Sequence, residues 1–401
     1  MDTIITSTAL AALETIDWDF TNATTNYSTH SLHPYPAKYI PQIPHAIIKE
    51  LSKPDEVVAD IFCGSGTTLV EALRLGRHAK GVDANPLACL ISEAKTSRLV
   101  PDEAAALEAL AKRAQVLGAT ITPYADSLFP SEAFVSTAPR PGSAAISFWF
   151  EPFVIEEITE ALSWCHAMPT ETTRTISKVA LSSIIVTVSK QDSDTRYVRR
   201  EKNIIPGDTL KRFARALTDA VKTIAAFSEE VSPTLRREVY YANLLTGPDI
   251  GDVDLVVCSP PYPNAYSYHL YHMTRMVWFG MDQPAFKREE IGSHRKYSSN
   301  GQNGATVETF RGEMTTIFEW LARHLRRDRY ACFVVGNSTI RGETINNANL
   351  ISEVAARAGF REVGRFSREM QASKKAFNPE HGRIKTEDIV ILQNGAAYGH
   401  E

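Results

Sequence analysis

From about residue 31 onward, short apolar runs alternate with amphipathic segments, and this alternation predicts an α/β fold. The spacing predicts a helix over 45–51, a buried strand over 56–62, a helix over 67–76 that ends at Gly76, and a second strand over 79–85. A strand, a helix and a strand at this spacing form a βαβ unit, which requires a parallel sheet with a right-handed crossover.

The same alternation resumes after residue 236 and extends the predicted sheet. Further elements are predicted in the order strand, strand, helix, strand and helix, over 237–243, 253–259, 307–326, 330–337 and 349–359. Two last strands, over 361–370 and 386–393, follow each other without a helical crossover. They therefore imply an antiparallel pair at an edge of the mostly parallel sheet.

Roughly 140 residues, 97–236, separate the second and third predicted strands. A loop of that length is implausible, and most of the region has helical periodicity. The predicted helices cover 101–118, 154–168, 175–189 and 209–227. We therefore expect an N-terminal arm (1–30), a catalytic domain formed by 31–96 and 237–401, and a mostly helical inserted domain (97–236).

Composition and charge narrow the functional classes only a little. With 43% hydrophobic and 22% charged residues among 401, the composition is typical of a globular protein. The net charge of −4 gives no global positive field, so nucleic-acid binding needs a local basic face. Candidate basic tracts are Arg196–Lys202, Arg323–Arg329 and Arg365–Lys385, although such runs are often solvated helix faces.

Cysteine usage and targeting signals point to a soluble cytoplasmic protein without metal. The five cysteines lack C-x-x-C or Cys/His ligand spacing, which disfavours zinc and disulfides. The N-terminus lacks a cationic start, and the longest apolar stretch, Val179–Val188, is too short to cross a bilayer. If the protein binds DNA, we expect it to be associated with the nucleoid.

A Gly-x-Gly turn follows the first predicted strand and runs into a helix at Asp60–Thr68. Dinucleotide-binding turns have a third glycine where this chain has Leu69, and the P-loop Gly-Lys-Ser/Thr is absent. The turn therefore suits a more compact cofactor. Asp83 ends the second strand, 19 residues past Gly64, where a carboxylate can accept both hydroxyls of a ribose. A simple turn or N-cap aspartate is the alternative at that position.

The tetrapeptide Ser259-Pro260-Pro261-Tyr262 follows another apolar strand. Such a turn is suited to chemistry on an exocyclic amino group of a nucleic-acid base. The nitrogen of that group is a poor nucleophile because its lone pair is delocalised into the base. The Ser259 side chain and the Pro260 carbonyl can accept its two hydrogens as the nitrogen pyramidalises, and the prolines hold the turn rigid. Tyr262 would stack on an extruded base. Cytosine C5 chemistry is disfavoured because it needs a cysteine nucleophile, typically in a Pro-Cys dipeptide that this chain lacks.

The pattern Asp-x-Phe-x-Gly-x-Gly-Thr-Thr at Asp60–Thr68 resembles the cofactor-binding motif of the amino-group (N4-cytosine and N6-adenine) DNA methyltransferases. Its second position, Ile61 here, is more often proline in that family. His33–Tyr39 resembles the family segment that closes over the methionine part of the cofactor. The resemblance implies a Rossmann-like methyltransferase sheet, here with a helical insertion, and S-adenosylmethionine as cofactor.

The same resemblance implies a set of cofactor-binding residues. They are Tyr35, Pro36, Lys38, Asp60, Phe62, Gly64, Gly66, Thr67, Thr68, Asp83 and Asn243. Asn243 departs from the family pattern, because an Asp near the adenine ring is usual at that point. The catalytic residues implied are Ser259, Pro260, Pro261 and Tyr262, and no metal ligand is implied.

Family members whose tetrapeptide begins with Ser mostly methylate cytosine N4, whereas Asp or Asn usually accompanies adenine N6. Ser259 therefore favours N4 of a cytosine flipped out of double-stranded DNA, in restriction-modification or host DNA modification. Adenine N6 and a base amino group of RNA are the alternatives. The insertion is a candidate for target recognition, and any restriction endonuclease would be a separate partner.

Two further classes are disfavoured. A nucleotide-dependent dehydrogenase conflicts with Leu69 and with the tetrapeptide. A binding module that kept the fold without catalysis conflicts with the intact Ser259–Tyr262 sequence.

Overall fold

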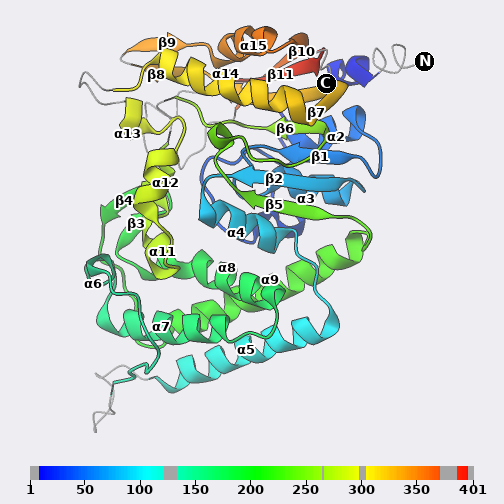
Figure 1. Ribbon diagram of the computed structural model, residues 1–401. Coiled ribbons are helices and arrows are strands. Elements are labelled where there is room, and N and C mark those ends of the chain that lie inside the picture. The colour runs from blue at the N-terminus through cyan, green and yellow to red at the C-terminus, as the bar shows by residue number, and fades with distance from the viewer. Residues whose placement is uncertain are drawn as a thin grey trace.

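A computed structural model describes residues 9–121, 133–263, 266–297, 304–340, 342–370 and 386–395. Its centre is a seven-stranded sheet in the order β10-β11-β7-β6-β1-β2-β5 (Figure 1). The strands are β1 (Val57–Asp60), β2 (His78–Asp83), β5 (Arg237–Tyr241), β6 (Val253–Cys258), β7 (Leu325–Gly336), β10 (Phe360–Glu369) and β11 (Thr386–Asn394).

Strand order reverses at the centre of the sheet. From β1 the chain adds β2 and β5 on one side, and β6 and β7 on the other, with every one of these pairs parallel. Ligands of open α/β sheets bind at the carboxyl ends of the strands at such a reversal, here between β1 and β6. The predicted mostly parallel sheet with an antiparallel pair is confirmed, since β11 runs antiparallel to both β7 and β10.

One face of the sheet is covered by α2 (Gln42–Leu51) and α3 (Thr67–Arg74), and α4 (Pro86–Lys95) continues this layer beside β2 and β5. The opposite face is covered by α14 (Val307–His324) and α15 (Asn347–Arg357). β6 is buried on both faces because its side chains alternate between the two layers. Val257 packs with the α2–α3 core and Val256 with the α14–α15 core.

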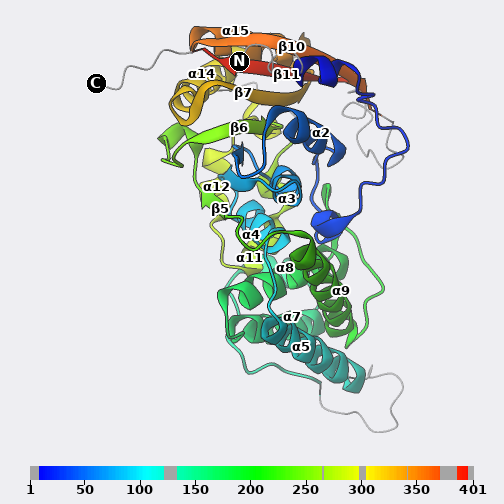
Figure 2. The same cartoon turned by 90° about the vertical axis from the view of Figure 1, so that its right-hand side faces the viewer.

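The region between β2 and β5 folds mainly into helices that stack below the sheet and elongate the molecule (Figures 1 and 2). Beyond α4 they are α5 (Pro101–Thr120), α6 (Ala144–Trp149), α7 (Pro152–His166), α8 (Glu171–Val188) and α9 (Asp208–Glu230). Their apolar core is continuous with α4, which contributes Leu87 and Ile91 to it. The division into domains stays a prediction.

Several short elements were not predicted, because three to seven residues carry too little periodicity to be recognised. They are the hairpins β3–β4 (Gln191–Ser193 and Arg196–Arg199) and β8–β9 (Ser338–Ile340 and Glu343–Ile345), and the helices η1 (Ser28–Ser31), α6, η3 (Leu244–Thr246), α10 (Tyr268–Tyr271), α11 (Met273–Trp278), α12 (Gln283–Glu289) and α13 (His294–Tyr297). The longer helix α4 was not predicted either. α11 anchors the segment after β6 to the helical layer, since Trp278 is buried with its ring 5.6 Å from that of Phe150.

The described part of the N-terminal segment packs on the catalytic sheet. Leu13 and Trp18 are buried, and the Trp18 ring stacks on Phe366 of β10 with 5.6 Å between centroids. The Asp19 carboxylate accepts a hydrogen bond from the Glu369 amide at 2.6 Å. Residues from the two ends of the described chain therefore meet at one edge of the sheet.

Candidate active site

The Gly-x-Gly turn leaves β1 and starts α3. Gly64 and Gly66 both have positive φ, 49° and 76°, the region where a side chain is strained. A Cβ on Gly66 would lie 2.9 Å from the Ser92 hydroxyl and 3.1 Å from the Ser92 Cα. Glycine is therefore required at Gly66 both by conformation and by the close approach of α4.

Asp60 and Thr68 hold this turn from behind. The Thr68 hydroxyl donates to Asp60 Oδ2 at 2.6 Å, and the Phe62 amide donates to Asp60 Oδ1 at 3.0 Å. Burial raises the pKa of Asp60 to about 7. The Tyr39 hydroxyl contacts both Asp60 and Thr68. Asp60, Gly66 and Thr68, all predicted to bind cofactor, shape the turn without lining the cavity beside it.

That cavity, the cofactor cavity, lies at the carboxyl ends of β1, β2, β5 and β6. Nine of the residues predicted from sequence line it: Tyr35, Lys38, Phe62, Gly64, Thr67, Asp83, Asn243, Ser259 and Pro261. Pro36 is buried next to Tyr35 and does not line it. The structure thus brings together five separate segments of the chain.

Asp83 is oriented by two backbone amides. Gly64 N–H donates to Oδ2 and Asn85 N–H donates to Oδ1, each at 2.8 Å. Burial raises the pKa of Asp83 to about 6, although these hydrogen bonds oppose the shift. Each carboxylate oxygen keeps a further lone pair that a ribose hydroxyl can use.

Asn243 follows β5, which ends at Tyr241, and it caps η3, because its Oδ1 accepts a hydrogen bond from the Leu245 amide at 2.9 Å. Its side-chain amide differs from the aspartate usual in the family in being able to donate hydrogen bonds at this wall of the cavity.

The cofactor cavity has features that fit S-adenosylmethionine. The Ser65 hydroxyl lines it and is buried with no hydrogen-bond partner among the described residues. Phe62 and Ile291 supply apolar wall for an adenine ring. Together with the Asp83 carboxylate, these groups suit a nucleoside that carries a polar tail.

The tetrapeptide begins one residue after β6, and β6 pairs with β1. The Ser259–Tyr262 turn therefore lies beside the Gly-x-Gly turn. Ser259 Oγ lies 3.3 Å from the Tyr262 hydroxyl, which donates to the Val334 carbonyl of β7 at 3.3 Å. The polar end of Tyr262 is thus tied to the sheet.

A second and wider cavity, the acceptor cavity, lies on the other side of the tetrapeptide. All four residues Ser259–Tyr262 line it, and most of its remaining wall is aromatic or polar, including Phe20, Lys38, Tyr39, Tyr266, Tyr268, Arg368 and Glu387. Lys38, Tyr39, Ser259, Pro261 and Tyr268 line both cavities. The two cavities therefore share a wall at Ser259.

Sequence reasoning did not assign Tyr39, Asn85, Tyr268 and Glu290 to the site. The Tyr268 ring stacks on Tyr35 with 6.1 Å between centroids. The Glu290 carboxylate accepts the Tyr268 amide at 2.5 Å and contacts His269 Nδ1 at 2.5 Å. The available signal was the aromatic and charged character of the segments 262–269 and 290–297, which resemble extensions in a subset of the family.

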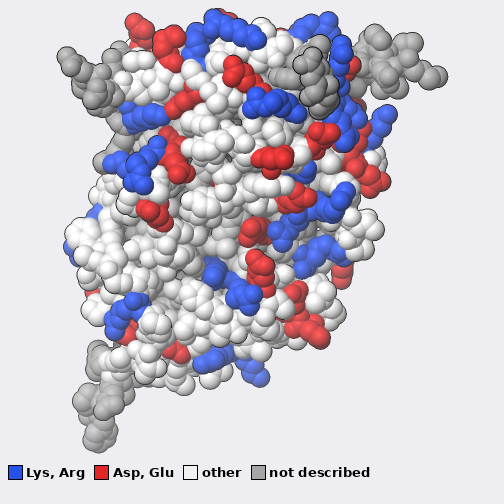
Figure 3. Space-filling model, viewed as in Figure 1, with Lys and Arg blue, Asp and Glu red and all other residues white. Residues whose placement is uncertain are grey.

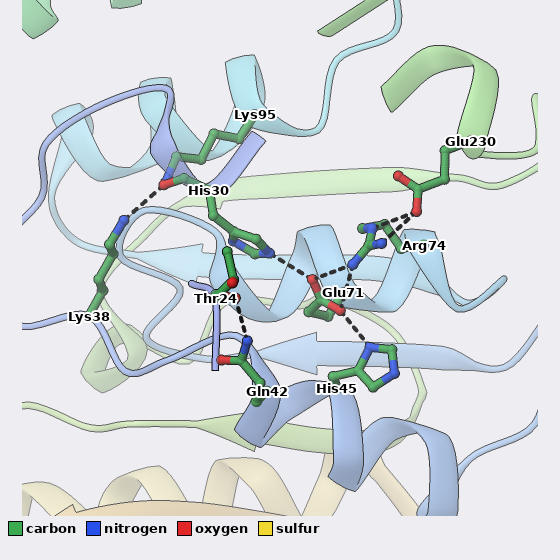
Figure 4. A network of polar contacts seen from close by, with 9 residues as sticks. All are labelled: Thr24, His30, Lys38, Gln42, His45, Glu71, Arg74, Lys95 and Glu230. Carbon is green, nitrogen blue, oxygen red and sulfur yellow. Dashed lines mark hydrogen bonds and ion pairs between the residues drawn. The ribbon is translucent and has the colours of Figure 1, made fainter. Parts of the chain in front are cut away.

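The segment over the cofactor cavity is fixed by a buried network around Glu71 of α3 (Figure 4). The Glu71 carboxylate contacts His30 Nε2 at 2.6 Å, His45 Nδ1 at 2.7 Å and Arg74 at 3.1 Å. Burial raises the pKa of Glu71, but the hydrogen bonds from the two histidines outweigh it and bring the pKa to about 2. Lys38 joins the network by donating to the His30 carbonyl at 2.8 Å.

The three basic tracts lie in different places. Arg196–Lys202 includes β4 of the insertion, on the same side of the molecule as α12 and α13 (Figure 1). Arg323–Arg329 lies at the amino end of β7, opposite to the cavities, so it cannot share their face. Of the third tract, 371–385 lies outside the described residues. On the face in Figure 3, basic and acidic side chains are interspersed.

In the described part of the chain, no group of three or more His, Cys, Asp or Glu is placed to hold a metal ion. None of the described helices combines the length and apolarity needed to cross a membrane.

Two curated relatives match a short part of the chain. Type II methyltransferase M.MjaII of Methanocaldococcus jannaschii is 34% identical over 88 residues, which are 21% of this chain and 17% of the relative. Type II methyltransferase M.MvaI of Kocuria varians is 41% identical over 87 residues, 21% of this chain and 19% of the relative. The matched part thus spans less than a fifth of either relative.

A solved rRNA methyltransferase from Streptomyces viridochromogenes aligns over 96% of this chain and 95% of its own. The two chains are 11% identical with a TM-score of 0.35, which is a weak similarity.

The sequence model of the DNA methylase family matches residues 8–94. The matched region contains Tyr35, the Gly-x-Gly turn and Asp83, and it ends well before the tetrapeptide. The tetrapeptide is therefore a separate indication of the same chemistry. The match over residues 8–94 shows that this part of the chain is similar to the DNA methylase family, and the two type II methyltransferases are similar to 21% of the chain.

Proposed function

We propose that the protein is a DNA methyltransferase that transfers a methyl group from S-adenosylmethionine to an exocyclic amino group, with N4 of cytosine as the acceptor. The observation that carries the proposal is the shared wall at Ser259 between the cofactor cavity and the acceptor cavity. A methyl donor in one and a base in the other would meet at the tetrapeptide.

On the donor side, Asp83 would accept the ribose hydroxyls and the Gly64 backbone would lie along the nucleoside. Tyr35 and Tyr268 stack on each other and would form an aromatic wall of the cofactor cavity. S-adenosylmethionine supplies an electrophilic methyl group when bound. The task of these residues is to hold it in line with the acceptor nitrogen, because alignment supplies much of the rate in such displacements.

On the acceptor side, Ser259 Oγ and the Pro260 carbonyl would accept the two amino hydrogens. Withdrawing the nitrogen lone pair from the ring makes it available to the methyl carbon. Bound S-adenosylmethionine would supply the methyl carbon, and its sulfur–carbon bond would break, with the electron pair left on sulfur, as the nitrogen–carbon bond formed. The nitrogen then releases one proton, through the Ser259 hydroxyl, to water.

The choice of cytosine N4 is supported by Ser259 as the first residue of the tetrapeptide, as in most N4-cytosine members that the sequence resembles. Adenine N6, and a base amino group in RNA, are the competing acceptors. The aromatic walls given by Tyr39, Tyr262 and Tyr266 suit any flipped base and do not separate these three.

Double-stranded DNA is the proposed partner, and residues 97–236 are proposed to recognise its sequence. The β3–β4 hairpin supports this role, because a two-stranded ribbon fits the major groove. Its outer residues are exposed, Tyr197 by 41% and Val198 by 57%, and the Arg200 side chain is 72% exposed. Replacing residues 97–236 with the corresponding region of a relative of different specificity should change the methylated sequence. If the methylated DNA sequence does not change, the insertion does not recognise the target.

The test of the function is methyl transfer with labelled S-adenosylmethionine to DNA and to RNA from a host without base methylation. Nucleoside analysis of the products identifies the methylated atom. We expect N4-methylcytosine in DNA and no label in RNA. N6-methyladenine in the product would show that the acceptor is adenine N6 and not cytosine N4, with the reaction class unchanged. Label confined to RNA would overturn the proposal.

A further inference from the structure

Arg368 is a buried arginine whose hydrogen bonds are incomplete. It lies near the end of β10, and its side chain is 7% exposed. Nε donates to the Trp18 carbonyl at 3.1 Å and Nη1 donates to Glu387 Oε2 at 2.9 Å. Nη2 has no partner among the described residues, and Arg368 lines the acceptor cavity. Nη2 is not among the atoms that are buried without a partner, so it is accessible from the open space of the cavity and can donate to a ligand bound there.

Arg368 is connected to the tetrapeptide through Glu387. The two residues face each other across the β10–β11 pair, and Glu387 is paired with Gly336 at the carboxyl end of β7. Burial raises the pKa of Glu387, while Arg368 and the Tyr262 hydroxyl oppose that shift. The guanidinium is therefore held at a fixed place in the cavity that contains Ser259.

The hydrogen-bonding edge of cytosine is complementary to such a group. When the amino group of cytosine is held by Ser259 and Pro260, the next two polar atoms along the ring edge are N3 and O2. Both are acceptors, and a guanidinium has only donors, arranged in a plane. Adenine in the same position offers N1 and then a carbon-bound hydrogen. A free Nη2 with two N–H groups therefore matches cytosine better than adenine.

We infer that Arg368, fixed by Glu387 and the Trp18 carbonyl, recognises the N3–O2 edge of the acceptor cytosine and so sets the base specificity of methyl transfer. This inference rests on the proposed function and makes it more specific. Arg368 is a binding residue for the base, and Glu387 is a positioning residue that acts through it.

The test uses the full chain and a DNA duplex that carries the methylation site mapped by sequencing DNA from expressing cells. The acceptor cytosine is replaced in turn by 3-deazacytosine, which lacks the ring nitrogen, and by an analogue without O2. For the wild type, kcat/KM should fall roughly 10- to 100-fold with at least one analogue, the range expected when one good base contact is lost.

Arg368→Lys should lower kcat/KM for the natural duplex by a similar factor and should then lose little more with either analogue. A purely structural role for Arg368 would lower the rates for all three duplexes together and leave the analogue penalty intact, which would overturn the inference. Affinity for S-adenosylmethionine, measured by calorimetry, should stay within about twofold of wild type, as expected for a residue outside the cofactor cavity.

Arg365→Lys is the matched control. Arg365 is on the same strand, but its guanidinium bonds to Glu362 and Asn349 away from the acceptor cavity. It should behave as wild type with all three duplexes. If Arg368→Lys does not fold, Glu387→Gln serves instead, because it keeps Arg368 and loosens its support. This variant should show a smaller analogue penalty than wild type, and an unchanged penalty counts against the inference.

The outcome for the wild type separates this inference from the proposed function. If the wild type methylates adenine in DNA, the role of Arg368 is wrong and the methyltransferase activity stands. If the wild type labels no DNA at all, the proposed function itself fails.

Discussion

Gly292 packs directly on the backbone of Tyr262. A Cβ on Gly292 would lie 2.6 Å from the Tyr262 carbonyl oxygen and 3.2 Å from the Pro261 carbonyl carbon. Gly292 also has a positive φ of 73°. The turn that contains Glu290 and Gly292 therefore forms the support on which the tetrapeptide rests, and this support has no room for a methyl group.

Gly292→Ala should displace the tetrapeptide and lower kcat about 100-fold, because a shift of about 1 Å in a reacting group has costs of that order. Gly280→Ala is the control. Gly280 has a similar φ of 63° but nothing within 4 Å of its added Cβ, so it reports the backbone strain alone. Steady-state methyl transfer measures both variants. Equal losses in the two would show that the contact with Tyr262 is unimportant.

Ser259→Ala should leave S-adenosylmethionine binding nearly unchanged and lower kcat about 100- to 1,000-fold, the usual effect of removing one group that stabilises a developing charge. The reason is that Ser259 Oγ is the proposed acceptor for one amino hydrogen. Single-turnover transfer and calorimetry measure the two quantities. A fully active variant would show that another group accepts the hydrogen.

Affinity for S-adenosylmethionine should depend on the ionisation of Asp83, whose pKa burial raises to about 6. Ribose hydroxyls donate to the charged carboxylate, so binding favours the ionised form. The dissociation constant should be constant above pH 7 and should rise by up to about tenfold per unit as pH falls below 6. Calorimetry from pH 5 to 8 measures this dependence, and Asp83→Asn should bind weakly with a flat profile. A flat profile for the wild type would exclude Asp83 as the titrating ligand.

Glu71→Gln should destabilise the fold by roughly 3 kcal/mol, because it leaves a buried cluster of donors without their carboxylate. Glu230→Gln is the matched control, since Glu230 contacts the same Arg74 but its side chain is 39% exposed. It should cost less than about 1 kcal/mol. Urea unfolding at pH 7 measures both free energies of unfolding.

The pH dependence of the Glu71→Gln effect has a defined sign. The pKa of Glu71 is lowered in the folded state to about 2 from an ordinary value of 4.5. The stabilisation is therefore complete above about pH 4.5 and is lost as pH falls towards 2. The difference between wild type and Glu71→Gln should shrink over that window, and a difference that stays constant there would contradict the role given to the carboxylate.

The parts of the fold predicted correctly are those in which pattern and packing agree. β6 was predicted because a strand buried on both faces has to be apolar throughout, and α3 because Gly66 and Gly76 delimit it. The inserted helices α5, α7, α8 and α9 were predicted from their helical periodicity, whereas the six-residue α6 was not. The hairpin β3–β4 was missed because its few residues are stabilised by tertiary packing, for instance by the hydrogen bond between Gln191 and Thr274 at 2.7 Å.

Nine of the predicted site residues line the cofactor cavity, whereas others support the turn beside it. Asp60 and Thr68 belong to the motif, yet the structure places them behind the wall of the cofactor cavity. A sequence motif shows which residues occur together. It does not distinguish residues that line the cavity from residues that hold the turn in place. Tyr39 lies in the motif-like segment His33–Tyr39 and Arg368 in a basic tract, but neither was assigned to the site, because the packing of distant segments is what brings them to the cavities.

β11 is the last strand of the sheet along the chain, and it lies between β7 and β10. During synthesis, β10 therefore leaves the ribosome before the strand that attaches it to the rest of the sheet. A growing chain that stops short of residue 386 contains the Gly-x-Gly turn and the tetrapeptide, but it lacks Glu387 and the support that Glu387 gives to Arg368. The order of translation thus keeps an unfinished chain from forming the complete acceptor cavity.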